Sequence, residues 1–212
     1  MAAGHALSEL ICVAAGFLSG SVLYCVYLPL AFKGIDVTKV SVDKNPGTHN
    51  AFQYAGAPLG MLCLAFELAK GYVPVMLSMK LMDPASPVFA AVMLAPVAGH
   101  AFSPLKRFHG GKGIAVSFGV LLALIPHQLV VFALAAAYLV SLLLPIHPNE
   151  KKTVVVFSVF ALAALLLEKT FSVRLGCLLI ALLVVYKNWA DADITFPLRS
   201  SAVDNAQKNS LN

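Results

Sequence analysis

The stretch Gly99 to Gly113, GHAFSPLKRFHGGKG, organises the chain, because it is a polar loop between two long apolar runs. Glycines let backbone N–H groups approach a ligand closely, and consecutive N–H groups form an anion-binding concavity. A helix from Ile114 onward would point its N-terminus at the same anion. The stretch therefore predicts a phosphate-binding loop at a membrane surface, formed by His109, Gly110, Gly111, Lys112 and Gly113. A basic loop that only sets membrane topology is the alternative.

The composition indicates an integral membrane protein. Of the 212 residues, 59% are hydrophobic and 12% are charged, whereas a soluble domain carries about 25% charged residues. The basic residues lie in short loops and form no stripe with aromatics between them, which argues against nucleic acid and favours anionic lipids or small anionic substrates. The four cysteines form no CxxC pair and no histidine–carboxylate motif is present, so we expect no metal and no cofactor.

The apolar runs predict an all-α bundle with about seven transmembrane helices in one domain, residues 1–190, and a polar, flexible tail at 191–212. The expected spans are 6–32, 57–79, 86–102, 113–125, 126–146, 153–167 and 171–186. Several are shorter than the roughly 20 residues of a straight crossing, so six spans and a re-entrant hairpin is an alternative.

The positive charges orient these spans. With the N-terminus outside, the outer loops hold only Lys80, Lys169 and Arg174, and nearly all other Lys and Arg residues fall inside. This bias follows the positive-inside rule. It predicts that the loop 33–56, the loop 99–113 and the C-terminal tail all face the cytoplasm of a cell-membrane protein and can line one site.

The loop 33–56 is too polar for lipid and too long for a simple turn, so we expect it to carry function. Its Asn and Thr side chains suit a polyol or a phosphate, and Gly47 allows close approach of the backbone. The candidate ligands in this loop are Asp43, Asn45, Gly47, Thr48, His49 and Asn50. An ordinary Asn-Pro-Gly turn followed by a helix cap is the alternative.

Two spans contain ionisable residues. Glu67 and Lys70 are three positions apart, on one helical face, and ionisable groups within a span either pair or serve a site. Lys70 either pairs with Glu67 or reaches an anionic substrate. His100 closes the third span and is a candidate base, phosphate donor or helix cap.

At these residues the chain resembles the bacterial integral-membrane glycerol-3-phosphate acyltransferases that use acyl phosphate. The resemblance covers residues 20–119 well and the other spans by hydropathy only. It rests on Gly20-Ser21, Asn45-Pro46-Gly47 with Asn50, Glu67-x-x-Lys70-Gly71-x-x-Pro74, Gly99-His100 and Phe108-x-Gly110-Gly111-Lys112-Gly113.

The resemblance implies seven spans, three cytoplasmic motifs around one site, and acyl transfer to the 1-hydroxyl of glycerol 3-phosphate, giving lysophosphatidic acid in phospholipid synthesis. Asn45, Gly47, Asn50 and Lys112 match the family's site positions, and His100 matches without a settled role. In this interpretation Lys112 and the amides of residues 110–113 hold a phosphate, the first loop positions the acceptor, and His100 or His49 orients or shuttles protons.

The chain also departs from the family pattern. Asp43 replaces the family's Ser, His49 replaces a Thr, and Gln53 replaces an Arg that binds phosphate. The third motif, His-Arg-x-Asn in the family, reads Asn188-Trp189-Ala190-Asp191. These losses of positive charge keep two alternatives open: a relative acting on another phosphorylated acceptor, and a transporter or lipid-binding membrane protein without catalysis.

Overall fold

The computed structural model describes residues 2–189, and all regular structure in this range is helical. The polar tail expected at 191–212, and Ala190 and Asp191 of the third motif, lie outside it. The helices are α1 (Ala2–Ser21), α2 (Tyr24–Lys33), α3 (Val37–Val40), α4 (Thr48–Ala55), α5 (Ala57–Leu81), α6 (Phe89–Ala101), the 3₁₀ turn η1 (Pro104–Lys106), α7 (Ile114–Leu122), α8 (Val130–Leu142) and α9 (Asn149–Leu167), then a last helix, Phe171–Trp189. The all-α bundle is confirmed.

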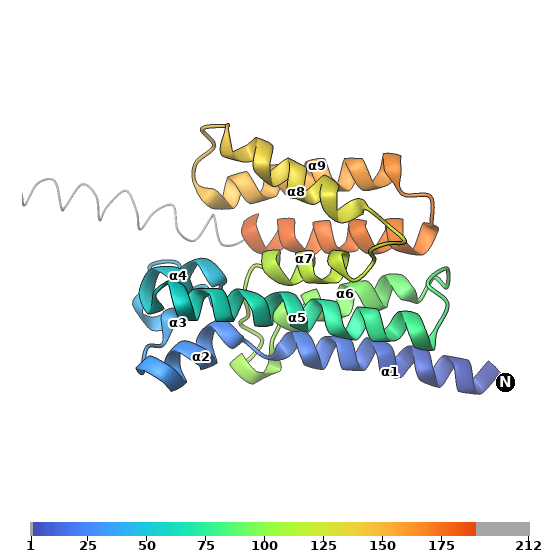
Figure 1. Ribbon diagram of the computed structural model, residues 1–212, viewed down its shortest axis with the longest axis horizontal. Helices are drawn as coiled ribbons and strands as arrows, with labels where there is room; N and C mark the ends of the chain where they lie inside the picture. Colours follow the sequence, from blue (N-terminus) through green and yellow to red (C-terminus); the bar gives the residue numbers. More distant parts are fainter. Residues whose placement is uncertain (1, 190–212) are drawn as a thin grey trace, which may run out of the picture.

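The long helices run side by side, with α1 and α5 along one edge and α8 and α9 along the other (Figure 1). Within residues 2–189, three segments are long and apolar enough to cross a membrane: Gly4–Lys33, Ala57–Leu81 and Phe171–Trp189. The number of crossings and their orientation stay predictions, because the apolar helix α8 has only 13 residues and α6 is equally short. Many large apolar side chains face outward, as lipid-facing surfaces require; among them are Leu18, Leu142, Leu166 and Leu182.

The first apolar segment breaks between α1 and α2, next to the small residues Ser19-Gly20-Ser21. A break in a span frees backbone carbonyls, which need partners when no water is present. Ser103 Oγ donates to the Ser21 carbonyl at 2.6 Å, and Lys70 Nζ donates to the Val22 carbonyl at 2.7 Å. The break is therefore held by one side chain from the loop 99–113 and one from the ionisable pair of α5.

Helices α1 and α6 pack backbone against backbone. A Cβ at Gly20 would collide with the Pro96 carbonyl of α6, and a Cβ at Gly99 would collide with the Phe17 carbonyl of α1. Small residues at these two positions permit the contact. Because Gly99 ends the apolar part of α6, this packing also fixes where the loop from Phe102 to Gly113 begins.

The helix connections gather at two ends of the bundle. The loop carrying α3 and α4, the loop after α6 and the start of α9 lie at one end, and the N-terminus lies at the other (Figure 1). At the N-terminal end, Ser86 Oγ donates to Glu9 at 2.8 Å and Gln128 Nε2 donates to Thr170 at 3.2 Å. The basic loops therefore share one end, as the charge pattern predicted.

Candidate active site

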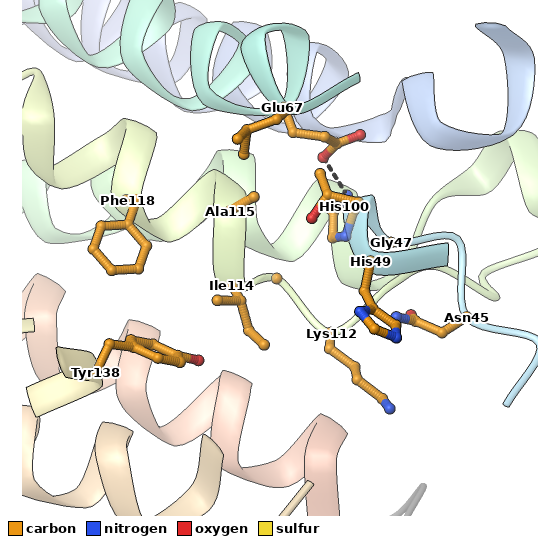
Figure 2. A pocket seen from close by; sticks show the side chains of 13 residues that line it. Asn45, Gly47, His49, Glu67, His100, Lys112, Ile114, Ala115, Phe118 and Tyr138 are labelled. Carbon is orange, nitrogen blue, oxygen red and sulfur yellow. Dashed lines mark ion pairs between the residues drawn. The ribbon is translucent and has the colours of Figure 1, made fainter. Parts of the chain in front are cut away.

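The two polar loops meet around one cavity. It has a volume of about 340 Å³ and is lined by Asn45, Gly47, Thr48, His49, Leu64, Glu67, His100, Lys112, Gly113, Ile114, Ala115, Phe118 and Tyr138. Asn45, His49 and Lys112 gather on one side, and Phe118, Ile114 and Tyr138 lie on the other (Figure 2). The cavity thus has a polar part that suits a headgroup and an apolar part that suits a hydrocarbon chain.

Asp43 organises the first loop. Its Oδ1 accepts hydrogen bonds from the Asn45 backbone N–H at 3.2 Å and from Asn50 Nδ2 at 2.7 Å, and Asn50 Nδ2 also donates to the Asn45 carbonyl at 2.8 Å. Asn50 is buried and does not line the cavity, so its observed contacts shape the loop. Asp43 likewise stands behind the cavity wall and reaches it through Lys112.

Among the described residues that line the cavity, Lys112 is the only Lys or Arg. Its Nζ lies 3.0 Å from Glu150 Oε1 and 3.4 Å from Asp43 Oδ2. Burial alone would raise the pKa of Asp43, but the Asn50 hydrogen bond and the charge of Lys112 outweigh it and hold that pKa below its usual range. The pKa of Glu150 is also lowered, because its hydrogen bonds and Lys112 outweigh its burial.

The glycine turn has a different role from the predicted one. The Gly110 N–H donates to the Ala101 carbonyl at 3.2 Å, and the Gly111 N–H donates to the His100 carbonyl at 3.1 Å. These two amides are therefore engaged with the end of α6 and do not form the free anion-binding concavity that the sequence suggested. A Cβ at Gly110 would collide with the His100 carbonyl, and a Cβ at Gly111 with the His100 ring, so the glycines allow this close contact.

The helix expected after the turn is confirmed and begins at Ile114. Gly113 precedes it with φ at +81°, a conformation that glycine adopts without strain. Gly113, Ile114 and Ala115 all line the cavity, so the positive N-terminal end of α7 faces the same space as Lys112.

Glu67, Lys70 and His100 form a buried cluster. Glu67 Oε2 lies 2.8 Å from Lys70 Nζ and 3.1 Å from His100 Nδ1, and Lys70 Nζ lies 2.9 Å from the same ring nitrogen. Neither oxygen of the buried Glu67 carboxylate has a hydrogen-bond partner within the described part of the chain, but at 2.8 Å its charge attracts the Lys70 ammonium whatever the angle. The ion pair of Glu67 and Lys70 is thus present, while the approach of His100 was not foreseen.

Lys70 does not line the cavity, and its ammonium is taken up by Glu67, His100 and the Val22 carbonyl. His109 is also away from the cavity: it is exposed, and its Nδ1 contacts the Arg107 carbonyl at 2.8 Å. Two other residues were candidates to replace the positive charges that the family has at position 53 and in the third motif. Lys106 contacts Thr38 at 3.3 Å and Asp36 at 3.9 Å and does not line the cavity, whereas His49 does.

Asn188, from the third motif, does not line the cavity. It is buried and donates from Nδ2 to the Val184 carbonyl of its own helix at 2.8 Å.

Sequence reasoning missed Glu150, although it is the one acidic residue in the basic segment His147 to Lys152. It also missed the cavity-lining role of Phe118 and Tyr138, whose rings lie 5.7 Å apart. No group of His, Cys, Asp or Glu in residues 2–189 has the arrangement of a metal site.

The fold and the cavity together define a helical membrane protein with a pocket that has one apolar side and one polar side carrying Lys112. The family described as Glycerol-3-phosphate acyltransferase matches residues 10–194, and the chain belongs to this family.

Relatives in the same family share extended parts of the sequence. A glycerol-3-phosphate acyltransferase of Hydrogenobaculum sp. is 33% identical over 82% of this chain and 86% of its own length. Another, from Myxococcus xanthus, is 39% identical over 58% of this chain and 61% of its own length.

Two solved structures have the same fold. The crystal structure of PlsY (YgiH), an integral membrane glycerol 3-phosphate acyltransferase, in its glycerol 3-phosphate form, matches with a TM-score of 0.76. The match has 24% sequence identity and covers 88% of this chain and 90% of PlsY. The lysophosphatidic acid form of PlsY matches with a TM-score of 0.75 and the same coverage.

Proposed function

We propose that this chain transfers a fatty acyl group from acyl phosphate to the 1-hydroxyl of glycerol 3-phosphate, giving lysophosphatidic acid. The observation that carries the proposal is the shared cavity, in which Lys112 and the first loop face an apolar wall. Family membership and the relatives named above support the activity.

In the proposed reaction, the acceptor hydroxyl oxygen attacks the acyl carbonyl carbon. A C–O ester bond forms, the bond between the carbonyl carbon and the phosphate oxygen breaks, and the hydroxyl proton leaves with the released phosphate. The positive N-terminal end of α7 stabilises the negative charge on the leaving phosphate as the bond breaks. No covalent enzyme intermediate is needed, because both substrates meet in one cavity.

The cavity residues divide the remaining work. The phosphate of glycerol 3-phosphate binds Lys112, with Asn45, Thr48 and His49 around it and Gly47 allowing close backbone approach. Asp43 and Asn50 keep that loop in shape. His100 orients the glycine turn through its carbonyl and ring, and Phe118 and Tyr138 line the path of the acyl chain.

We also propose that the site faces the cytoplasm of the cell membrane. The support is the charge bias: at the end of the bundle that carries α3 and α4 (Figure 1), Lys33 ends α2, Lys39 lies in α3 and Lys106 contacts Thr38 of α3.

A relative acting on another phosphorylated acceptor is the second candidate. Gln53 stands where the family has an Arg that binds phosphate, and Asn188 bonds its own helix. Each lost charge-assisted hydrogen bond is worth about 1.5–3 kcal/mol, so the acceptor affinity is sensitive to these changes.

The test uses the purified full chain in detergent with acyl phosphate and radiolabelled glycerol 3-phosphate. We expect labelled lysophosphatidic acid with acyl phosphate and none with acyl-coenzyme A. Complementation of a bacterial strain that lacks its own enzyme separates the candidates: rescue supports the proposal. Failure to rescue despite good membrane expression, with no labelled product in vitro, refutes it in favour of another acceptor or a non-catalytic protein.

A further inference from the structure

Lys112 is held between carboxylates from two distant parts of the chain. Asp43 comes from the first polar loop, and Glu150 comes from the first turn of α9. Glu150 is the nearer partner at 3.0 Å, and the side chains of Lys112 and Glu150 are only 10% and 14% exposed. This largely buried contact joins the start of α9 directly to the cavity wall.

The contact conflicts with the binding of an anion. One ammonium with two carboxylates leaves a net charge of −1 around the position where a phosphate would bind. A phosphate monoester carries about −1.5 to −2 charges at pH 7, so it is repelled while both carboxylates stay in place. A phosphate that bonds Lys112 must therefore replace at least one of its present partners.

We propose that Glu150 is a resident counter-ion of Lys112 that the substrate phosphate displaces, so that Glu150 sets the affinity of the site for phosphate. This inference rests on the phosphate site of the proposed function. Glu150 is the partner that can leave, because Asp43 also holds Asn45 and Asn50 and its departure would disrupt the loop. Glu150 extends from a separate element, the start of α9.

Displacement of this kind affects all phosphate ligands alike. The apparent dissociation constant equals the intrinsic one divided by the fraction of molecules in which Lys112 is available. Removing the charge of Glu150 raises that fraction, so inorganic phosphate and glycerol 3-phosphate should gain the same factor in affinity. Glu150 no longer contacts Lys112 once the ligand is bound, so the turnover of the bound substrate should change little.

The test compares the purified full-length wild type with Glu150→Gln, which keeps the shape of the side chain and removes its charge. Calorimetric titration with inorganic phosphate, and separately with glycerol 3-phosphate, should give dissociation constants about tenfold lower in the variant for both ligands. In the acylation assay, KM for glycerol 3-phosphate should fall by the same factor, with kcat within twofold. Glu150→Asp should lie between the two proteins, because its shorter carboxylate reaches Lys112 less well.

Glu168→Gln is the matched control, since it makes the same substitution at the other end of α9 and should leave both dissociation constants unchanged. Equal or weaker phosphate binding by folded Glu150→Gln overturns the inference, as does a gain for one ligand only. Tighter phosphate binding without any acyl transfer supports the role of Glu150 and refutes the proposed function. If neither the wild type nor Glu150→Gln binds phosphate, both the role of Glu150 and the proposed function are refuted.

Discussion

The ammonium of Lys112 lies 3.4 Å from Oδ2 of Asp43, across 69 positions of sequence. This contact joins the glycine turn to the first polar loop, and the two together form the polar side of one cavity. A cation on one loop and an anchoring carboxylate on the other keep the site assembled before any substrate arrives. Residues 43–50 and 110–113 therefore act as a unit, and changes on either side should affect the same cavity.

The pair of Asp43 and Lys112 should make stability depend on pH. The pKa of Asp43 in the folded protein is below its unfolded value of about 3.9, so the ionised carboxylate stabilises the fold above that value. This stabilisation is lost as the pH falls through the folded-state pKa. We expect Asp43→Asn to lower the melting temperature in detergent at pH 7, and the difference from wild type to shrink as the pH falls below about 4.

Asp83→Asn, at an exposed position between α5 and α6, is the control and should lose far less at pH 7. A melting-temperature difference for Asp43→Asn that stays constant down to the lowest pH would show that its ionisation does not stabilise the fold.

The buried cluster should be sensitive to the loss of one charge. Lys70→Met leaves Glu67 without its cation in a largely dry environment, which costs about 3–5 kcal/mol. We therefore expect a large drop in thermal stability in detergent, and partial recovery in the double variant Glu67→Gln with Lys70→Met. Lys80→Met on the exposed end of the same helix is the control. Equal melting temperatures for Lys70→Met and Lys80→Met would contradict the cluster's structural role.

The glycine turn should tolerate no side chain at its contact with His100. Gly111→Ala places a Cβ against the His100 ring, so the turn must move away from α6 and carry Lys112 with it. A shift of the His100 ring instead would disturb the cavity wall that this ring forms, so in either case we expect kcat/KM for acyl transfer to fall at least tenfold. Gly4→Ala, where a Cβ would meet no neighbouring atom, should match the wild type. Full activity in Gly111→Ala would show that the close packing on His100 does not matter for the site.

The apolar side of the cavity should bind the acyl donor. Phe118→Ala removes a ring from this wall, and loss of a Phe contact costs up to about 1.5–3 kcal/mol. We expect KM for the acyl donor to rise about tenfold and KM for glycerol 3-phosphate to stay within twofold. Phe132→Ala, on the outer surface of α8, is the control. A rise in KM for glycerol 3-phosphate alone would reverse our assignment of the two sides.

Local patterns in the sequence predicted much of this architecture. The apolar runs predicted where the helices lie, as at Ala57 and Ile114, where an apolar run and a helix begin together after a polar loop. The pairing of Glu67 with Lys70 followed from their three-residue spacing on one helix. The charge bias of the loops correctly predicted that the two polar loops share one end of the bundle.

Contacts between elements that are far apart in the chain could not be predicted from local sequence patterns. His100 reaches Glu67 only because α6 packs beside α5, and nothing in the spacing of 33 positions indicates this contact. The amides of Gly110 and Gly111 were expected to bind an anion, but they pair with the end of α6, because the loop folds back on itself. Glu150 was overlooked because a single acid among lysines resembles an ordinary solvated residue.

The most direct test of the account is the affinity of purified protein for glycerol 3-phosphate, measured by calorimetry without an acyl donor. Lys112→Ala should bind about 10- to 100-fold more weakly than wild type, since a charge-assisted hydrogen bond is lost. Lys106→Ala, in the same loop but tied to Asp36 and outside the cavity, should bind like the wild type. Wild-type affinity in Lys112→Ala would contradict the claim that this cavity holds the phosphate.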